Sequence, residues 1–441
     1  MKSTIIILSI LLCVTYCLGA FNPVEKKEIT SLPGLSGPLS SKQYSGFINV
    51  NQTTGAHLFY WLVESQGSAN DPFVVWLTGG PGCSSDLAYL TENGPYSVNP
   101  DLTLKENPYS WSTNNHVLYV DQPVGTGFSY LENGGPLSDG YVKNEKEMAD
   151  EMYVFLQRFF SLFPQFANND FFLVGESYSG HYLPSLATRI NQGNKASGTQ
   201  KIPLQGMAVG NGMVDPLNQY HSYGTYAYSH GLIDYALLQR IDKQYELCEK
   251  AINGGDFGAE SAECNIILQW IMNAGGPFNE YDVTQTCIPS EPLCYNFTAP
   301  TDYLNLPSVQ QTLGVQGKWN TCNMLVHYKI RKDWFIGERQ EVANMLDNEK
   351  QRVLIYNGIN DFIVNFMGSE RWVRAMDWSH QQEFVNGNRT VWMVNGLIAG
   401  HALSSNGLTM LTVANAGHMV PMNVPKNALD MINKFTRNQP F

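Results

Sequence analysis

A serine at position 177 lies in a sequence pattern that can make it a nucleophile. Residues 175–180 read GESYSG, follow the apolar run 171–174 and precede a stretch compatible with a helix. This pattern is typical of a sharp turn from strand to helix, which holds a serine hydroxyl out above a sheet. A serine hydroxyl alone is a poor nucleophile, so it needs a base, and the base needs an orienting partner.

Two residues farther along the chain can supply these partners. Asp361 lies in residues 356–361 (YNGIND) and His418 lies in residues 416–421 (AGHMVP), each at the end of a strand-like segment. The order Ser, Asp, His along the chain is the order found in the catalytic triads of α/β-hydrolases. We therefore predict a hydrolase with a triad of Ser177, Asp361 and His418.

The segments that must hold these residues alternate between strands and helices. Polar and apolar residues alternate over residues 43–64, which predicts a β-hairpin, and an apolar face predicts a helix over residues 144–163. This alternation indicates a mostly parallel sheet with helices on both faces, as in the α/β-hydrolase fold. Short apolar runs predict further strands over residues 72–77, 116–120, 171–174, 205–209, 352–356, 390–394 and 408–413.

The pattern changes between residues 215 and 330. Helical segments, Gly-rich loops and most of the cysteines occur there, and buried strand runs do not. We interpret residues 215–330 as a helical cap inserted into one sheet domain, which residues 21–214 and 331–441 form together. One α/β domain with an insertion explains the length of the chain.

The N-terminus and the cysteines indicate the compartment. Lys2 precedes the apolar residues 4–17, and Gly19-Ala20 follow, so residues 1–20 read as a signal peptide that is too short to span a membrane. No later stretch is long and apolar enough for a transmembrane helix. An even number of cysteines in a secreted chain favours disulfides over metal ligation. Of the eight cysteines, Cys13 and Cys17 belong to the signal peptide, and six remain: Cys83, Cys248, Cys264, Cys287, Cys294 and Cys322. Glycosylation sequons occur at Asn51, Asn296 and Asn388.

The composition excludes some classes of protein. Hydrophobic residues make up 43% of the chain and charged residues 15%, which favours a globular protein over a disordered one. A net charge of −12 without a basic cluster argues against a nucleic-acid partner. No pattern indicates a metal or a cofactor.

Residues 79–82 (GGPG) directly follow an early strand. A loop at this place in α/β-hydrolases donates one backbone N–H to the oxyanion hole, and the residue after the nucleophile donates the other. The two donors expected here are Gly80 and Tyr178. Such donors matter because the loss of one typically lowers the rate by roughly 10²–10³-fold.

Several motifs in one order are shared with a known family. The chain resembles the serine carboxypeptidases, the family of the yeast vacuolar enzyme, the plant enzymes and lysosomal cathepsin A. The resemblance spans nearly the whole chain after the signal peptide. The matching stretches are residues 76–85 (WLTGGPGCSS), 92–95 (ENGP), Trp111, 121–130 (DQPVGTGFSY), 175–180 (GESYSG), 210–212 (GNG), Asp361 with Asn365, and 417–421 (GHMVP).

The resemblance implies a role for each matching residue. Ser177 would attack the carbonyl, His418 would act as base and then as acid, and Asp361 would orient His418. The terminal carboxylate of a peptide substrate would be held by Thr78, Gly79, Glu92 and Glu176, and Met419 would line the pocket of the departing residue. The implied disulfides are Cys83–Cys322, Cys248–Cys264 and Cys287–Cys294.

The implied carboxylate site predicts a dependence on pH. Two glutamates and a substrate carboxylate within hydrogen-bonding distance cannot all be ionised, so protons are retained and the apparent pKa values rise. A protonated glutamate can then donate to the substrate. The hypothesis is a carboxypeptidase, secreted or lysosomal or vacuolar, that is most active on peptides with a free C-terminus at mildly acidic pH. A homodimer is one expected assembly.

Three positions depart from the family pattern. Thr78 stands where the peptidases usually carry asparagine, and threonine there resembles members that work as acyltransferases. Glu176 argues for the peptidases, since those acyltransferases resemble one another in having aspartate before the serine. Ile359 replaces a common aspartate, and Val364 replaces a cysteine found in some members. The alternative functions are therefore acyl transfer to a small hydroxyl acceptor and, from another class, a protective binding partner of other lysosomal proteins.

Overall fold

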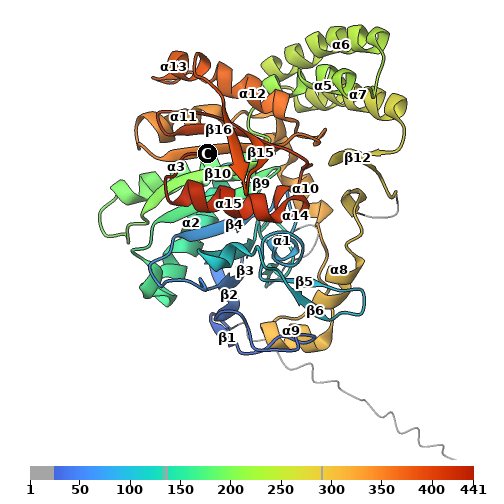
Figure 1. Cartoon of the computed structure of the whole chain (residues 1–441). Coiled ribbons are helices and arrows are strands. Elements are labelled where there is room, and N and C mark those ends of the chain that lie inside the picture. The colour runs from blue at the N-terminus through green and yellow to red at the C-terminus, as the bar shows by residue number, and fades with distance from the viewer. Residues whose placement is uncertain (1–23, 133, 135–137, 290–291) are drawn as a thin grey trace, which may run out of the picture.

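A mixed β-sheet runs through the middle of the protein (Figure 1). The computed structural model describes residues 24–132, 134, 138–289 and 292–441, and the predicted signal peptide lies outside them. The strand order is β1-β2-β3-β7-β4-β9-β10-β13-β16-β15-β14, with β8 paired to β3. The strands are β1 (Lys27–Ile29), β2 (Gln43–Asn51), β3 (Ala56–Val63), β4 (Phe73–Leu77), β7 (His116–Asp121), β8 (Tyr130–Leu131), β9 (Phe171–Glu176), β10 (Leu204–Gly210), β13 (Arg352–Gly358), β14 (Thr390–Val394), β15 (Leu397–Ser405) and β16 (Leu408–Val413).

The strands from β7 to β16 in this order are parallel, and both flanks of the sheet are antiparallel. The mostly parallel α/β sheet and the hairpin of β2 and β3 were predicted and are confirmed. Strand β15 was not predicted. It joins β14 through Asn395 and Gly396, which both have positive φ, as a tight hairpin turn requires. Gly400 and His401 interrupt the apolar alternation of β15, which weakens its signal in the sequence.

Helices cover both faces of the sheet, because the buried side chains of each strand alternate between two cores. In β9, Leu173 joins the first core and Phe172 joins the second. The first core packs against α2 (Glu145–Leu162), α3 (Ser179–Lys195), α11 (Arg339–Asp347) and α12 (Phe366–Ala375). The second core packs against α1 (Ser85–Thr91), α8 (Thr298–Leu304), α9 (Pro307–Leu313) and α15 (Pro425–Thr436).

The stretch from residue 215 to 330 has two parts. Its first helices form a separate hydrophobic cluster. They are α4 (Pro216–Tyr220), which packs beside α12, and α5 (Tyr223–Ser229), α6 (Tyr235–Gly254) and α7 (Phe257–Gly275), which lie away from the sheet (Figure 1). The chain then passes through β11 (Phe278–Asn279) and β12 (Asp282–Thr286), and α8 and α9 return to pack beside β1 and β5 (Tyr96–Val98), which pairs with β6 (Leu104–Glu106). The description of this stretch as one inserted cap stays a prediction.

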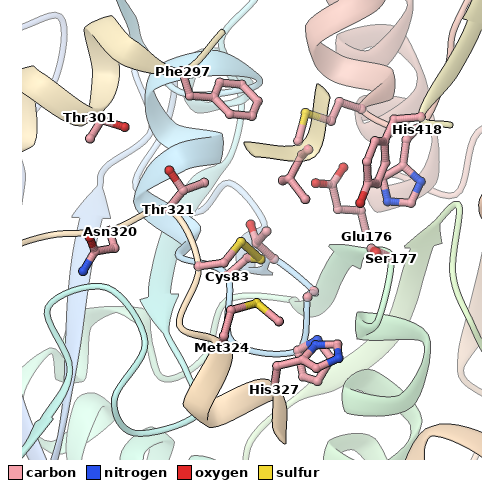
Figure 2. A pocket seen from close by; sticks show the side chains of 18 of the residues that line it. Cys83, Glu176, Ser177, Phe297, Thr301, Asn320, Thr321, Met324, His327 and His418 are labelled. Atoms are coloured by element: carbon pink, nitrogen blue, oxygen red, sulfur yellow. A yellow bond between two sulfur atoms is a disulfide. The ribbon is translucent and has the colours of Figure 1, made fainter. Parts of the chain in front are cut away.

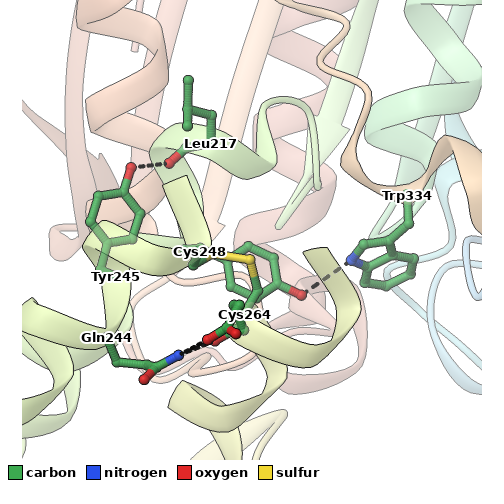
Figure 3. Close-up of a disulfide and its surroundings, with 8 residues drawn as sticks. Leu217, Gln244, Tyr245, Cys248, Cys264 and Trp334 are labelled. Carbon is green, nitrogen blue, oxygen red and sulfur yellow. Dashed lines mark hydrogen bonds between the residues drawn. A yellow bond between two sulfur atoms is a disulfide. The ribbon is translucent and has the colours of Figure 1, made fainter. Parts of the chain in front are cut away.

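Three disulfides link the described cysteines, in the pairs that the resemblance implied. Cys248–Cys264 joins α6 to α7, and the neighbouring Tyr245 donates from its hydroxyl to the carbonyl of Leu217 at 2.7 Å (Figure 3). Cys287–Cys294 closes a short loop, and Cys83–Cys322 joins the segment after β4 to the segment before α10 (Met324–Ile330). Asn296 and Asn388 are exposed and Asn51 is half-buried, and their glycosylation stays a prediction.

Among the described residues, no helix is both long enough and apolar enough to cross a membrane. The remaining short helices are α13 (Gln381–Val385) and α14 (Val420–Asn423), with 3₁₀ turns η1 (Trp111–Thr113), η2 (Pro164–Phe166), η3 (Pro292–Cys294) and η4 (Arg331–Phe335).

Candidate active site

Ser177 occupies the sharp turn between β9 and α3. Its φ of 62° lies in the left-handed region, which a non-glycine residue adopts only where the surroundings hold it. The Ser177 N–H donates to the carbonyl of Gly210 at 2.9 Å, and the Met213 N–H donates to the Ser177 carbonyl at 3.0 Å. These two bonds tie the turn to the end of β10, so the sheet positions the serine.

Asp361 and His418 form a buried hydrogen-bonded pair. His418 Nδ1 lies 2.8 Å from Asp361 Oδ2, and both side chains are almost fully buried. An ionised carboxylate can only accept, so Nδ1 carries the proton and Nε2 is left as the acceptor. Asp361 follows β13 and His418 follows β16, and both strands lie in the parallel part of the sheet. Their carboxyl-terminal ends therefore meet at the edge where Ser177 stands.

Asn211 is a further residue of this group, and the sequence analysis placed it in a matching motif but gave it no role. Its amide donates to Asp361 Oδ2 at 2.7 Å, and the Ile363 N–H donates to Asp361 Oδ1 at 3.1 Å. Asn211 is fully buried and has a φ of 41°. The available signal was a polar residue between two glycines directly after a parallel strand. Asn211 restrains the carboxylate that orients His418.

The glycine loop after β4 lies against the serine turn. A Cβ atom on Gly79 would stand 2.4 Å from the Tyr178 nitrogen and 2.7 Å from the Ser177 Cβ, so no side chain fits there. Gly80 has a φ of 113°, which favours glycine. The two predicted oxyanion donors, the N–H groups of Gly80 and Tyr178, therefore belong to two segments in direct contact.

The four residues predicted to hold a carboxylate are gathered at one end of this loop. Thr78, Gly79 and Glu176 line the same pocket as Ser177 and His418, whereas Glu92 does not reach the pocket wall. Glu92 ends α1 and lies behind Glu176, and the two carboxyl groups interact directly. Burial raises the pKa of Glu92 to about 8. Burial, and then the nearby Glu92, raise the pKa of Glu176 well above its usual range.

The hydroxyl of Thr78 is arranged to donate. The Trp76 indole N–H donates to Thr78 Oγ1 at 2.9 Å, and the Thr78 N–H donates to Ser85 Oγ at 3.2 Å. A hydroxyl that accepts from an indole still carries its own hydrogen. Since Thr78 lines the pocket, this hydrogen is available to a group bound there.

The pocket has a volume of about 680 Å³ and opens beside Ser177 (Figure 2). Glu176, Ser177 and His418 lie close together on one side of it, and the Cys83 disulfide forms part of the opposite wall. Met419 also lines this pocket, and its role at the departing residue stays a prediction. The remaining walls come mainly from apolar and hydroxyl side chains, among them Tyr281, Leu293, Phe297, Thr301 and Met324.

The sheet, the serine turn and the Asp361–His418 pair together define an α/β-hydrolase. The family model described as serine carboxypeptidase matches residues 33–438, and the chain belongs to that family. It is a hydrolase of the serine carboxypeptidase type.

Individual relatives agree with this assignment. The chain is 45% identical to serine carboxypeptidase S10 family member 1 of Dictyostelium discoideum, over 92% of this chain and 96% of the relative. It is 40% identical to serine carboxypeptidase 3 of Oryza sativa subsp. japonica, over 93% of this chain and 82% of the relative. The crystal structure of Kex1Δp, a prohormone-processing carboxypeptidase from Saccharomyces cerevisiae, superposes with a TM-score of 0.81 at 24% identity, over 90% of this chain and 92% of that one. This last likeness supports the fold.

Proposed function

We propose that the protein removes single residues from the C-terminus of peptides through an acyl-enzyme on Ser177, in an acidic compartment of the secretory pathway. The observation that carries the proposal is the pair of buried glutamates beside the serine. Glu176 lines the same pocket as Ser177, together with Thr78 and Gly79. Glu92 lies directly behind Glu176 and interacts with it. A buried carboxyl pair that retains a proton can donate a hydrogen bond to a carboxylate. A carboxylate is the group at the free C-terminus of a peptide.

The geometry leads to an ordered reaction. His418 Nε2 takes the Ser177 proton while Ser177 Oγ attacks the last peptide carbonyl, and the N–H groups of Gly80 and Tyr178 hold the resulting oxyanion. His418 then gives its proton to the departing amino group, and the C–N bond breaks to leave an ester on Ser177. A water molecule, deprotonated by His418, hydrolyses the ester and restores the serine. Asp361, held by Asn211, keeps His418 in the required tautomer throughout.

Product analysis tests this function. A blocked peptide incubated at pH 5 should lose one residue at a time from its C-terminus, as followed by mass spectrometry. The same incubation with a small alcohol distinguishes acyl transfer, because a transferase would yield the ester of the shortened peptide in place of the free acid. An ester as the main product would contradict the proposal.

The pH profile should follow the carboxyl pair. A raised pKa means that the pair keeps a proton at pH 5 and loses it as the pH rises toward about 8. We expect kcat/KM for peptides with a free C-terminus to fall by about twofold from pH 5 to pH 8 and by roughly tenfold at one pH unit higher, since half of the groups with a pKa of about 8 have lost their proton at pH 8. Ester hydrolysis should persist closer to neutrality because it depends less on this site.

The Glu176→Gln variant is the matched control for the pH profile. Its amide donates at every pH, so its kcat/KM should be lower at pH 5 but nearly flat up to pH 8. A wild-type kcat/KM that climbs steadily through pH 8 would contradict the role assigned to the pair.

Replacing Asn211 tests whether its hydrogen bond to Asp361 contributes to catalysis. Replacing it by alanine removes the 2.7 Å bond to Asp361 and leaves the carboxylate less restrained. We expect kcat to fall by roughly 10–100-fold with little change in KM, because the loss concerns the base and not substrate binding. Steady-state kinetics on one peptide decide this, with circular dichroism to show that the variant is folded. An unchanged kcat would assign Asn211 to the fold alone.

A further inference from the structure

One face of α10 continues outward from the active-site pocket. Met324, His327 and Tyr328 lie on it at the spacing i, i+3, i+4, and Arg331 follows at i+7. Met324 and His327 line the pocket. Met324 is 68% exposed and Tyr328 57% exposed, whereas Val326 and Ile330 on the opposite side of the helix are buried. We refer to Met324, His327, Tyr328 and Arg331 as the α10 face.

The glycine loop, residues 78–82, connects the α10 face to the residues around Ser177. The loop begins at Thr78 and Gly79 in the carboxylate site, passes the oxyanion donor Gly80 and ends at Gly82. There the Asn323 N–H donates to the Gly82 carbonyl at 2.8 Å, and a Cβ atom on Gly82 would stand 3.0 Å from the Val326 Cβ. Along the chain, Gly80 stands between the carboxylate end and the α10 end of the loop, and the Cys83 N–H closes the loop by donating to the Gly79 carbonyl at 3.1 Å.

A long substrate must extend out of the pocket. With its terminal carboxylate at Thr78 and Gly79 and its scissile carbonyl at Gly80, the part before the scissile bond leaves the pocket, and α10 forms a wall that continues outward to exposed side chains. Figure 2 shows Met324 and His327 on one side of the Cys83 disulfide and Phe297 on the other. The His327 imidazole lies beside the carbonyls of Gly80 and Pro81, next to the position of the reacting carbonyl.

The far end of the α10 face is positively charged in a chain whose net charge is −12. Lys329, Arg331 and Lys332 fall within four residues, and no ion pair among the described residues involves them. The Arg331 guanidinium lies 3.4 Å from the centre of the Tyr328 ring, so it is stacked against the face. The nearby Asp333 accepts instead from the Glu145 N–H at 2.7 Å.

We propose that the α10 face binds the part of a polypeptide substrate that precedes the scissile bond, and that it favours an acidic residue about four positions before that bond. Seven residues of helix rise about 10 Å, which corresponds to about three residues of extended peptide. This proposal rests on the proposed function and adds a preference for long peptides over dipeptides. Exposed apolar side chains at the rim supply contact area, and Arg331 supplies the charge.

A length series of blocked peptides tests the proposal. The peptides share their last two residues and contain two to six residues, and the longest carries Glu, Gln or Lys at the fourth position before the scissile bond. For the wild type at pH 5 we expect kcat/KM to rise about tenfold from the shortest to the longest peptide, equivalent to about 1.4 kcal/mol. Among the longest peptides, Glu should be preferred to Lys by about fivefold.

Two variants and a control make the test specific. Tyr328→Ala should abolish most of the length effect, and Arg331→Glu should reverse the preference between Glu and Lys, while both variants hydrolyse the dipeptide like the wild type. Tyr235→Ala is the control, because Tyr235 is 59% exposed on α6, outside the pocket lining. It should leave every rate unchanged.

Three results would overturn the proposal. The first is a kcat/KM that does not depend on peptide length, and the second is a length effect that survives in Tyr328→Ala. The third is a dimer in analytical ultracentrifugation that Tyr328→Ala dissociates while the length effect persists, since the α10 face would then bind a second copy. Failure of the proposed function is a separate result, in which the blocked dipeptide itself is not cleaved.

Discussion

Replacing Ser177 by alanine is expected to lower kcat by roughly 10⁴–10⁶-fold while the protein stays folded. The alanine keeps the backbone turn but removes the hydroxyl oxygen that forms the acyl-enzyme. His418→Ala should cost a similar factor, because the hydroxyl is not activated without the base whose Nδ1 lies 2.8 Å from Asp361.

The double variant makes this prediction sharper. Residues that act as a unit are strongly non-additive, so Ser177→Ala with His418→Ala should be hardly slower than either single variant. The measurement is kcat on one blocked peptide for all four proteins, with a fluorophosphonate label to report the reactive serine. Losses that multiply in the double variant would contradict a shared mechanism.

Gly79→Ala is expected to lower kcat by roughly 10³-fold, the second large effect. The new Cβ would stand 2.4 Å from the Tyr178 nitrogen and 2.7 Å from the Ser177 Cβ, so either the loop or the serine turn has to shift. Both proposed oxyanion donors, the N–H groups of Gly80 and Tyr178, belong to these two segments. The loss of one donor typically lowers the rate by about 10²–10³-fold, and a displaced nucleophile adds to that loss.

A matched glycine separates this effect from a general loss of stability. Gly254 lies in α6 and has no positive φ, and a Cβ atom on it would meet nothing within 4 Å beyond the adjacent backbone of its own helix. Gly254→Ala should therefore be active and at least as stable as the wild type. Thermal unfolding and kcat measured side by side compare the two variants. A Gly79→Ala protein with near-normal kcat would show that the loop does not supply the oxyanion donors.

Much of the fold could be predicted because its strands are short apolar runs bounded by turn-forming residues. The turn around Ser177 carried the strongest signal, since glycines at positions 175 and 180 are needed where the backbone approaches Leu77 and Met213 closely. The missed strand β15 shows the limit. Its Asn395-Gly396 turn is a strong local signal, but Gly400 and His401 break the alternation on which a strand prediction depends.

The candidate site was harder to predict in its supporting contacts than in its triad. Serine, aspartate and histidine were found from motifs and their order, whereas Asn211 acts on Asp361 from the residue after β10, 150 residues earlier in the chain. Such a contact depends on the pairing of β10 with β13, which the sequence pattern does not specify. The position of Glu92 behind Glu176 depends likewise on how α1 packs against β7.

The most direct test of the central claim is a time course on a blocked dipeptide and on its C-terminal amide at pH 5. The account predicts rapid release of the free residue from the acid, little release from the amide, and neither with Ser177→Ala. This pattern would mean that the pocket recognises the terminal carboxylate through Thr78, Gly79 and the protonated glutamate pair. Equal cleavage of acid and amide, or no cleavage by a folded protein whose serine still reacts with a fluorophosphonate, would contradict it.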